Sequence, residues 1–202
     1  MRFIFALAAL AATAAAAPWA NWGVSHGLNY PRTTSNCMSD SDATKVANNF
    51  KTLIAAYSDS FSNKTMAVDF VDYSDSVMEL INGGCEGPEV LGTAVFSSRA
   101  EFQAGQGAQP PIPFEIIKTW NACSAVTIRW QSAQTPQLVT GIIVIEVVKN
   151  ADKKASQKWL IKTVYSEFNS GAWLVNLDVF NPPVCPAPPP PTSTPSRRML
   201  FV

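Results

Sequence analysis

The residue types in this chain exclude several kinds of catalysis before any fold is considered. Its one histidine, His26, lies in a stretch rich in Trp, Asn and Gly that shows no regular period. A Ser-His-Asp triad or a Cys-His pair needs an imidazole held in place by the fold, and many zinc sites use imidazole ligands. We therefore expect no histidine-based mechanism, no metal site and no cofactor. Carboxylates and tyrosine hydroxyls remain for acid–base chemistry.

Glu146 is the carboxylate in the most unusual setting, because it interrupts the apolar run Gly-Ile-Ile-Val-Ile-Glu-Val-Val. A carboxylate in such a run must be paired, lie solvated on an outer face, or sit in a cavity with a raised pKa. Arg129, on the preceding apolar segment, is its natural partner. We favour a structural ion pair between neighbouring strands, with a ligand clamp as the alternative.

Alternate side chains of the segment 157–168 combine aromatic bodies with polar tips. On a strand, residues two apart share a face. One face would carry Trp159, Ile161, Thr163, Tyr165 and Glu167. Lys162 falls on the opposite face, so we expect that side to meet solvent and the first to line a concavity. Such a surface is typical of a small-molecule site, whereas a filled core is the alternative.

A long helix and a run of strands are expected to position these residues. Apolar residues recur at helical spacing after Ser39, a plausible N-cap with Asp42 three residues on. This stripe consists of Ala43, Val46, Ala47, Phe50, Leu53, Ile54 and Tyr57. Further short helices are expected near 60–64 and 97–102, and a strand at 77–81. Four strands joined by short turns predict an antiparallel meander, and the order of elements predicts an α+β fold with helices on one face of a curved sheet. These strands cover 114–121, 124–131, 137–149 and 157–168.

The two ends of the sequence differ in composition from the middle. Residues 1–16 have a positive start, a short apolar run and small residues near Ala16, which is typical of a secretory signal peptide and too short for a membrane span. We expect an irregular leader at 17–38, a domain at 39–180 and a Pro-rich disordered tail at 181–202. The protein should therefore be exported and have no membrane partner.

Composition and short motifs indicate which partners, disulfides and modifications to expect. The formal net charge is zero and no basic run occurs, so a nucleic-acid partner is not expected. Four cysteines in an exported chain predict disulfides, and spacing alone leaves three pairings open. Asn63-Lys64-Thr65 is an N-glycosylation sequon, so we expect a glycoprotein if the producing cell is eukaryotic.

Several motifs resemble a known family. They include Asp-Phe-Val-Asp-Tyr-Ser-Asp-Ser-Val at 69–77, Trp-Asn-Ala-Cys-Ser-Ala-Val-Thr-Ile-Arg-Trp at 120–130 and Glu-Phe-Asn-Ser-Gly-Ala-Trp-Leu at 167–174. Together they are similar to the secreted NTF2-like proteins of filamentous fungi, from about Cys37 to Phe180. The resemblance implies a cone, in which a strongly bent antiparallel sheet wraps around a long first helix and leaves a pocket at its wide end. It carries over no activity.

Enzymes of this fold suggest where chemistry would lie. Its dehydratases and cyclases often use a His/Asp pair, which this sequence does not supply. Its isomerases use a carboxylate base with a tyrosine and a protonated acid. Tyr57, Asp72 (or Asp69) and Glu167 are the corresponding candidates for a catalytic trio. We favour structural roles for them, because Tyr57 completes the apolar stripe and closely spaced aspartates often cap turns.

Binding of a small, mainly apolar molecule in the cone is therefore the favoured function. A histidine-free, metal-free isomerase, dehydratase or cyclase is the alternative, and a protein–protein module such as a homodimer through the outer sheet face is a third interpretation. The residues expected to contact the ligand are Tyr57, Asp69, Asp72, Arg129, Glu146, Trp159, Tyr165 and Glu167.

The resemblance also selects among the cysteine pairings. Cys37 and Cys123 both lie in segments similar to the family, at the helix start and at a strand turn that a cone brings together. We predict a Cys37–Cys123 disulfide, which leaves Cys85 and Cys185 as a weaker second pair.

Overall fold

The computed structural model describes residues 37–181. The expected signal peptide, most of the leader, Cys185 and nearly all of the Pro-rich tail lie outside these residues. Within 37–181, no helix is long and apolar enough to cross a membrane.

Helix α1 (Asp40–Ala55) begins at the expected cap and carries the expected apolar stripe except Tyr57, which lies beyond its end. The Ser39 hydroxyl accepts a hydrogen bond from the Asp42 amide at 3.1 Å, and the Asp42 carboxylate accepts one from the Ser39 amide at 3.3 Å. This capping box satisfies two amides that a helix start leaves unpaired. The buried face packs against the sheet and consists of Ala43, Val46, Ala47, Asn49, Phe50 and Leu53.

Each of the four shorter helices begins after a side-chain cap. The cap oxygen accepts a hydrogen bond from the amide three residues later in every case. These helices are α2 (Asp59–Thr65), α3 (Asp75–Met78), α4 (Arg99–Gly107) and α5 (Ser170–Asn176). The expected strand at 77–81 is therefore wrong, because Ser74 caps α3 and the chain then continues into turns.

Six strands form one sheet in the order β2-β1-β6-β5-β4-β3. The expected meander is confirmed as β3 (Glu115–Asn121), β4 (Ala125–Ser132), β5 (Val139–Lys149) and β6 (Trp159–Phe168). Beyond the meander, β1 (Met66–Tyr73) pairs parallel to β6, and β2 (Ala94–Phe96) pairs antiparallel to β1.

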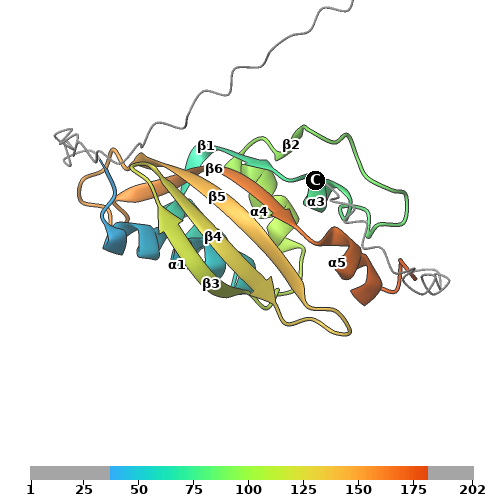
Figure 1. Cartoon of the computed structure of the whole chain (residues 1–202). Helices are drawn as coiled ribbons and strands as arrows, with labels where there is room; N and C mark the ends of the chain where they lie inside the picture. Colours follow the sequence, from blue (N-terminus) through green and yellow to red (C-terminus); the bar gives the residue numbers. More distant parts are fainter. Residues whose placement is uncertain (1–36, 182–202) are drawn as a thin grey trace, which may run out of the picture. The chain divides into compact units, whose positions relative to one another are not determined.

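The sheet curves, and α1 and α4 lie on its concave side (Figure 1). Helix α1 packs against β3, β4 and β6, and α4 packs against β1 and β2. The core between them includes Phe50, Leu53, Phe70, Ile128 and Ile145, each at most 4 % exposed. This is the expected α+β fold, with a strongly curved open sheet around the long first helix.

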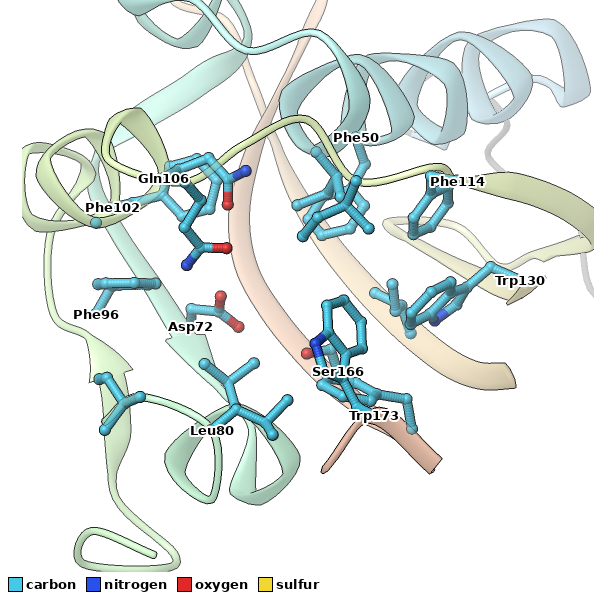
Figure 2. A pocket seen from close by; sticks show the side chains of 18 of the residues that line it. Phe50, Asp72, Leu80, Phe96, Phe102, Gln106, Phe114, Trp130, Ser166 and Trp173 are labelled. Atoms are coloured by element: carbon cyan, nitrogen blue, oxygen red, sulfur yellow. The ribbon is translucent and has the colours of Figure 1, made fainter. Parts of the chain in front are cut away.

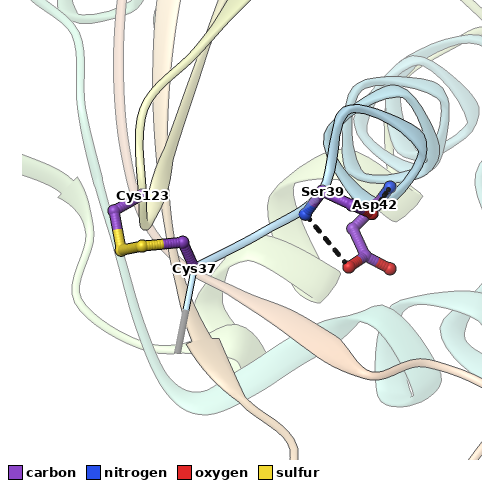
Figure 3. Close-up of a disulfide and its surroundings, with 4 residues drawn as sticks. All are labelled: Cys37, Ser39, Asp42 and Cys123. Carbon is purple, nitrogen blue, oxygen red and sulfur yellow. Dashed lines mark hydrogen bonds between the residues drawn. A yellow bond between two sulfur atoms is a disulfide. The ribbon is translucent and has the colours of Figure 1, made fainter. Parts of the chain in front are cut away.

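The predicted Cys37–Cys123 disulfide is confirmed and ties the segment before α1 to the sheet (Figure 3). The two Cα atoms lie 4.2 Å apart, and the bridge spans 86 positions of sequence. The Met38 amide also donates a hydrogen bond to the Cys123 carbonyl at 2.8 Å. The start of α1 is therefore fixed to the turn between β3 and β4.

Candidate ligand-binding site

A cavity of about 460 Å³ opens between the concave face of the sheet and the helices (Figure 2). The sheet side comes from the ends of β1, β4 and β6 and the start of β5, so the cavity lies at the end of the sheet away from the disulfide. The rest of its wall comes from α1, α3, α4 and α5, from Phe96 of β2, and from the segments that follow α3 and α4.

Seven aromatic rings dominate the wall of this cavity. Several pack against one another: Phe114 stacks on Trp130 with ring centroids 4.6 Å apart, and Phe168 lies 5.3 Å from Trp173. Mutual packing fixes the rings in place, so the space between them is preformed. The seven are Phe50, Phe96, Phe102, Phe114, Trp130, Phe168 and Trp173.

Among the described residues that line the cavity, only Asp72 has an ionisable side chain. It lies near the end of β1, where its backbone neighbours are Phe96 on β2 and Val164 on β6. The residue is only 6 % exposed, and its Oδ1 has no hydrogen-bond partner within 37–181. Burial, and after it the negative charge of Glu167, raises the pKa of Asp72 to about 7.

Two further buried polar side chains, Gln106 on α4 and Ser166 on β6, face the same space. Figure 2 shows Gln106, Phe96 and Leu80 around the Asp72 carboxyl. An amide and a hydroxyl can each donate and accept hydrogen bonds. The cavity therefore joins a large apolar wall to a small polar group centred on a carboxyl.

The face of β6 expected to line the concavity changes side part-way along the strand. The β5–β6 register shifts between Glu146, which faces Thr163, and Val147, which faces Ile161, so Lys162 is an extra residue. Such a bulge reverses the alternation beyond it. The inner residues are therefore Trp159 and Ile161, followed by Val164, Ser166 and Phe168.

Three expected ligand contacts lie away from the cavity: Tyr165 and Glu167 because of this bulge, and Trp159 because it stands at the other end of β6. Trp159 is buried but does not line it. Tyr165 is 44 % exposed and stacks on Tyr73 with ring centroids 5.3 Å apart. Glu167, also exposed, does not line the cavity.

Glu167 serves instead as an acceptor for the start of α3. Its two carboxylate oxygens accept hydrogen bonds from the Asp75 amide at 3.0 Å and the Ser76 amide at 3.1 Å, and from the Ser76 hydroxyl. Carboxylates are favourable at helix starts because amides there lack helical partners. Glu167 therefore joins the end of β6 to α3.

The candidate trio of Tyr57, Asp72 and Glu167 is not assembled. The Tyr57 hydroxyl donates a hydrogen bond to the Asp59 carboxylate at 2.6 Å, outside the cavity. Burial and this hydrogen bond raise the pKa of Tyr57 to about 12. Only Asp72 of the three lines the cavity.

The remaining charged candidates lie on outer surfaces. Arg129 faces Ile142 across the β4–β5 ladder, whereas Glu146 faces Ala125, four positions further along β5. The expected Arg129–Glu146 pair therefore does not form, and both side chains are exposed. Asp69 forms an exposed ion pair with Lys162 instead of entering the cavity.

The structure describes only part of two expected covalent features, the glycosylation site and the second disulfide. Asn63 is exposed on α2, and its side-chain oxygen accepts a hydrogen bond from Gln103 at 3.1 Å. Thr65 of the same sequon is fully buried. Cys85 is exposed in a loop, and its proposed partner lies outside the described residues. Glycosylation and the second disulfide stay predictions.

Most residues of the cavity wall are not among the ligand contacts predicted from the sequence, although some of them follow a helix or strand pattern. Phe102 and Gln106 are four residues apart on α4 and thus share one helix face. Trp130 has the inward parity of β4, together with Val126 and Ile128. Trp173 carries no such signal, because α5 is short and has no buried residue.

The sequence from residue 36 to 180 matches the family model of the NTF2-like domain. The chain belongs to this family. A comparison with curated proteins finds no match. Within 37–181, this NTF2-like domain also brings no three His, Cys, Asp or Glu side chains together as metal ligands.

Solved structures similar to this NTF2-like protein are distant in sequence. One is a protein of unknown function with a cystatin-like fold from Methylobium petroleophilum, with 14 % identity and a TM-score of 0.47, covering 65 % of this chain and 78 % of that one. Another is IdmH, a putative polyketide cyclase from Streptomyces antibioticus, with 13 % identity and a TM-score of 0.46, covering 68 % and 99 %. A third is AclR, a putative hydroxylase from Streptomyces galilaeus, with 16 % identity and a TM-score of 0.45, covering 71 % and 89 %. Similarity at this level carries no argument about what this protein binds.

Proposed function

We propose that this protein binds a small, mainly apolar molecule in the cavity between its sheet and helices. The observation that supports the proposal is a preformed space of about 460 Å³ walled mainly by aromatic and aliphatic side chains. Ligand sites in proteins typically have this size and make-up, with a few polar groups that fix orientation. Asp72, Gln106 and Ser166 are those polar groups here.

The proposal includes an extracellular setting. The Cys37–Cys123 bridge agrees with an oxidising compartment, where disulfides persist. The N-terminal residues 1–16 supply the independent argument, because their composition is typical of a secretory signal.

A bound molecule can be sought directly. Native mass spectrometry of the protein purified from its producing cells should show a mass excess over the denatured chain. The Ala108→Trp variant should lose it, because Ala108 is an exposed residue on the cavity wall and a large side chain there would occupy the space. Lys118→Trp, on an exposed strand position away from the cavity, is the matched control and should keep it. An excess that survives Ala108→Trp would place the molecule elsewhere.

Asp72 favours a second candidate function, which is acid–base catalysis on the bound molecule. A carboxyl with a pKa near 7 can take and return protons at neutral pH. Gln106 and Ser166 can donate hydrogen bonds to an oxygen of the substrate. An isomerase, dehydratase or cyclase could work this way without histidine or metal.

Proton exchange tests this second candidate without knowledge of the substrate. The probe is 2-tetralone in heavy water, whose hydrogens next to the carbonyl exchange when a base removes them. Wild-type protein should accelerate deuterium incorporation, and Asp72→Asn should remove the acceleration. Equal rates with wild type, Asp72→Asn and buffer alone would exclude catalysis of this kind.

A further inference from the structure

The described lining of the cavity carries a single ionisable group, and it is an acid. Its described lining contains Asp72 and no Lys, Arg or His. Asp72 is 6 % exposed, and its Oδ1 meets no donor within 37–181. Buried polar atoms are nearly always paired, so an orphaned carboxylate oxygen on a cavity wall indicates a donor supplied from outside the chain.

The elements around Asp72 add no cation to face it. Strand β2 holds no titratable residue, and β6 contributes the negative charge of Glu167. Charged side chains of α4 are engaged near its first turn, where Arg99 donates to the Met66 carbonyl and Glu101 accepts from the Ser97 amide. The other charged groups on adjoining elements are also held elsewhere: Lys162 by Asp69, Asp75 by the Gly92 amide and Glu79 by Ser170. Glu167 is therefore the charged group that acts on Asp72, and its charge is negative.

Aromatic rings also line the cavity near this position. Figure 2 places Phe96 and Phe102 on one side of the Asp72 carboxyl and Trp173 across the cavity from them. Ring faces carry negative charge density and attract cations, and the attraction is strongest where water is excluded. An ammonium group here would gain both from the rings and from the carboxylate. A hydroxyl would gain only a hydrogen bond, and an anion would be repelled.

We propose that the cavity selects an apolar amine, whose ammonium group donates a hydrogen bond to the Asp72 carboxylate while its hydrocarbon body fills the aromatic space. This inference rests on the proposed function and narrows it to one class of ligand. Acidic molecules such as fatty acids are excluded by the same charge distribution.

Three probes with one hydrocarbon cage test the selection: 1-adamantylamine, 1-adamantanol and adamantane-1-carboxylate. Their affinities for the full-length protein are measured by calorimetry at pH 8. The amine should bind about tenfold more tightly than the alcohol, because a charge-assisted hydrogen bond replaces a neutral one. The carboxylate should bind more weakly than the alcohol. Asp72→Asn should remove the preference for the amine, so that amine and alcohol bind within about threefold of each other. Glu146→Gln, a change on the outer face, should leave all three affinities unaltered.

A pH series on the wild type gives a readout that does not depend on any variant. Alkyl ammonium groups keep their proton from pH 5.5 to pH 8, whereas Asp72 must lose its own to accept the ligand. The affinity for the amine should therefore fall about tenfold or more from pH 8 to pH 5.5, and that for the alcohol should stay level. An alcohol or carboxylate that binds as tightly as the amine, or an amine affinity that is flat with pH, overturns this inference and leaves the proposed function standing. Absence of binding by all three probes overturns both.

Discussion

Asp42 and Asp72 lie at opposite ends of the sheet and show how two regions of the molecule differ. Asp42, near the disulfide, accepts hydrogen bonds from the Ser39 amide and from Lys158 at 2.9 Å. These contacts outweigh the opposing effect of burial and lower the pKa of Asp42 to about 2. Asp72, at the cavity, has an unpartnered oxygen and a pKa raised to about 7.

The two regions differ in how they contribute to the stability of the fold: the first stabilises it, and the second lowers its stability. At the first end a disulfide, a capping box and an ion pair hold α1 to the sheet. At the second end the core contains a cavity instead of side chains, and a carboxyl is buried without full compensation. Sites that bind ligands often carry such a cost.

Removal of the disulfide should have the largest effect on stability and little effect on the cavity. The double variant Cys37→Ser/Cys123→Ser frees a loop of 86 residues in the unfolded chain. We expect a loss of about 4 kcal/mol in the free energy of unfolding by urea, with the affinity for 1-adamantanol within a few-fold of wild type. A loss below about 1 kcal/mol would show that this end is held by other contacts.

Asp72→Asn should stabilise the protein at pH 8, by about 1–3 kcal/mol. The pKa of Asp72 is about 7 in the folded state, above the usual value of 3.8. Between about pH 4 and pH 7 the folded protein therefore holds a proton on Asp72 that the unfolded chain has lost. Stability should therefore fall as the pH rises from about 4 to about 7, and the penalty is complete above pH 7. Urea unfolding at several pH values should show this fall in wild type and not in the variant; a variant less stable at pH 8 would contradict the unpaired state of the carboxyl.

Asp42→Ala should act in the opposite direction, with a loss of about 1 kcal/mol at pH 7 from the cap and the partly exposed ion pair. The folded pKa of Asp42 lies below 3.8, so its contribution is present above about pH 4 and is lost as the pH falls through 2. Wild type and variant should therefore unfold at similar urea concentrations near pH 2. A difference that persists there would assign the loss to packing.

Glu167→Gln should have the smallest effect and sharpen the account of Asp72. Glutamine keeps an oxygen acceptor for the start of α3 but removes the negative charge that acts on Asp72. The pKa of Asp72 can be followed by carbon NMR of its carboxyl group. It should fall only slightly in the variant and stay above 3.8, because burial is the larger cause of its rise. A pKa that returns to the usual range would make Glu167, not burial, the main cause.

Sequence periodicity predicted the fold better than it predicted the site. The stripe of α1 and the strands of the meander repeat over many residues, so local errors average out. The single extra residue at Lys162 has no signature in an alternating strand, yet it reversed which side chains of β6 face the cavity. In the same way, apolar patterns do not determine the register between β4 and β5. The actual register places Arg129 and Glu146 four positions apart.

Asp72 could be named from sequence but not distinguished from its neighbours. It stands in a series with Asp69 and Asp75, and only the fold separates them. Asp69 pairs with Lys162, Asp75 binds the Gly92 amide, and Asp72 alone of the three enters the cavity. The parallel pairing of β1 with β6, a long-range contact, decides this outcome.

Calorimetric titration with 1-adamantanol tests the central claim most directly, because this neutral probe asks only whether the cavity accepts an apolar molecule. We predict saturable one-to-one binding to wild type and to Lys118→Trp, and a loss of at least about tenfold in affinity for Ala108→Trp. Unchanged affinity in Ala108→Trp, or no binding to wild type, would contradict the account.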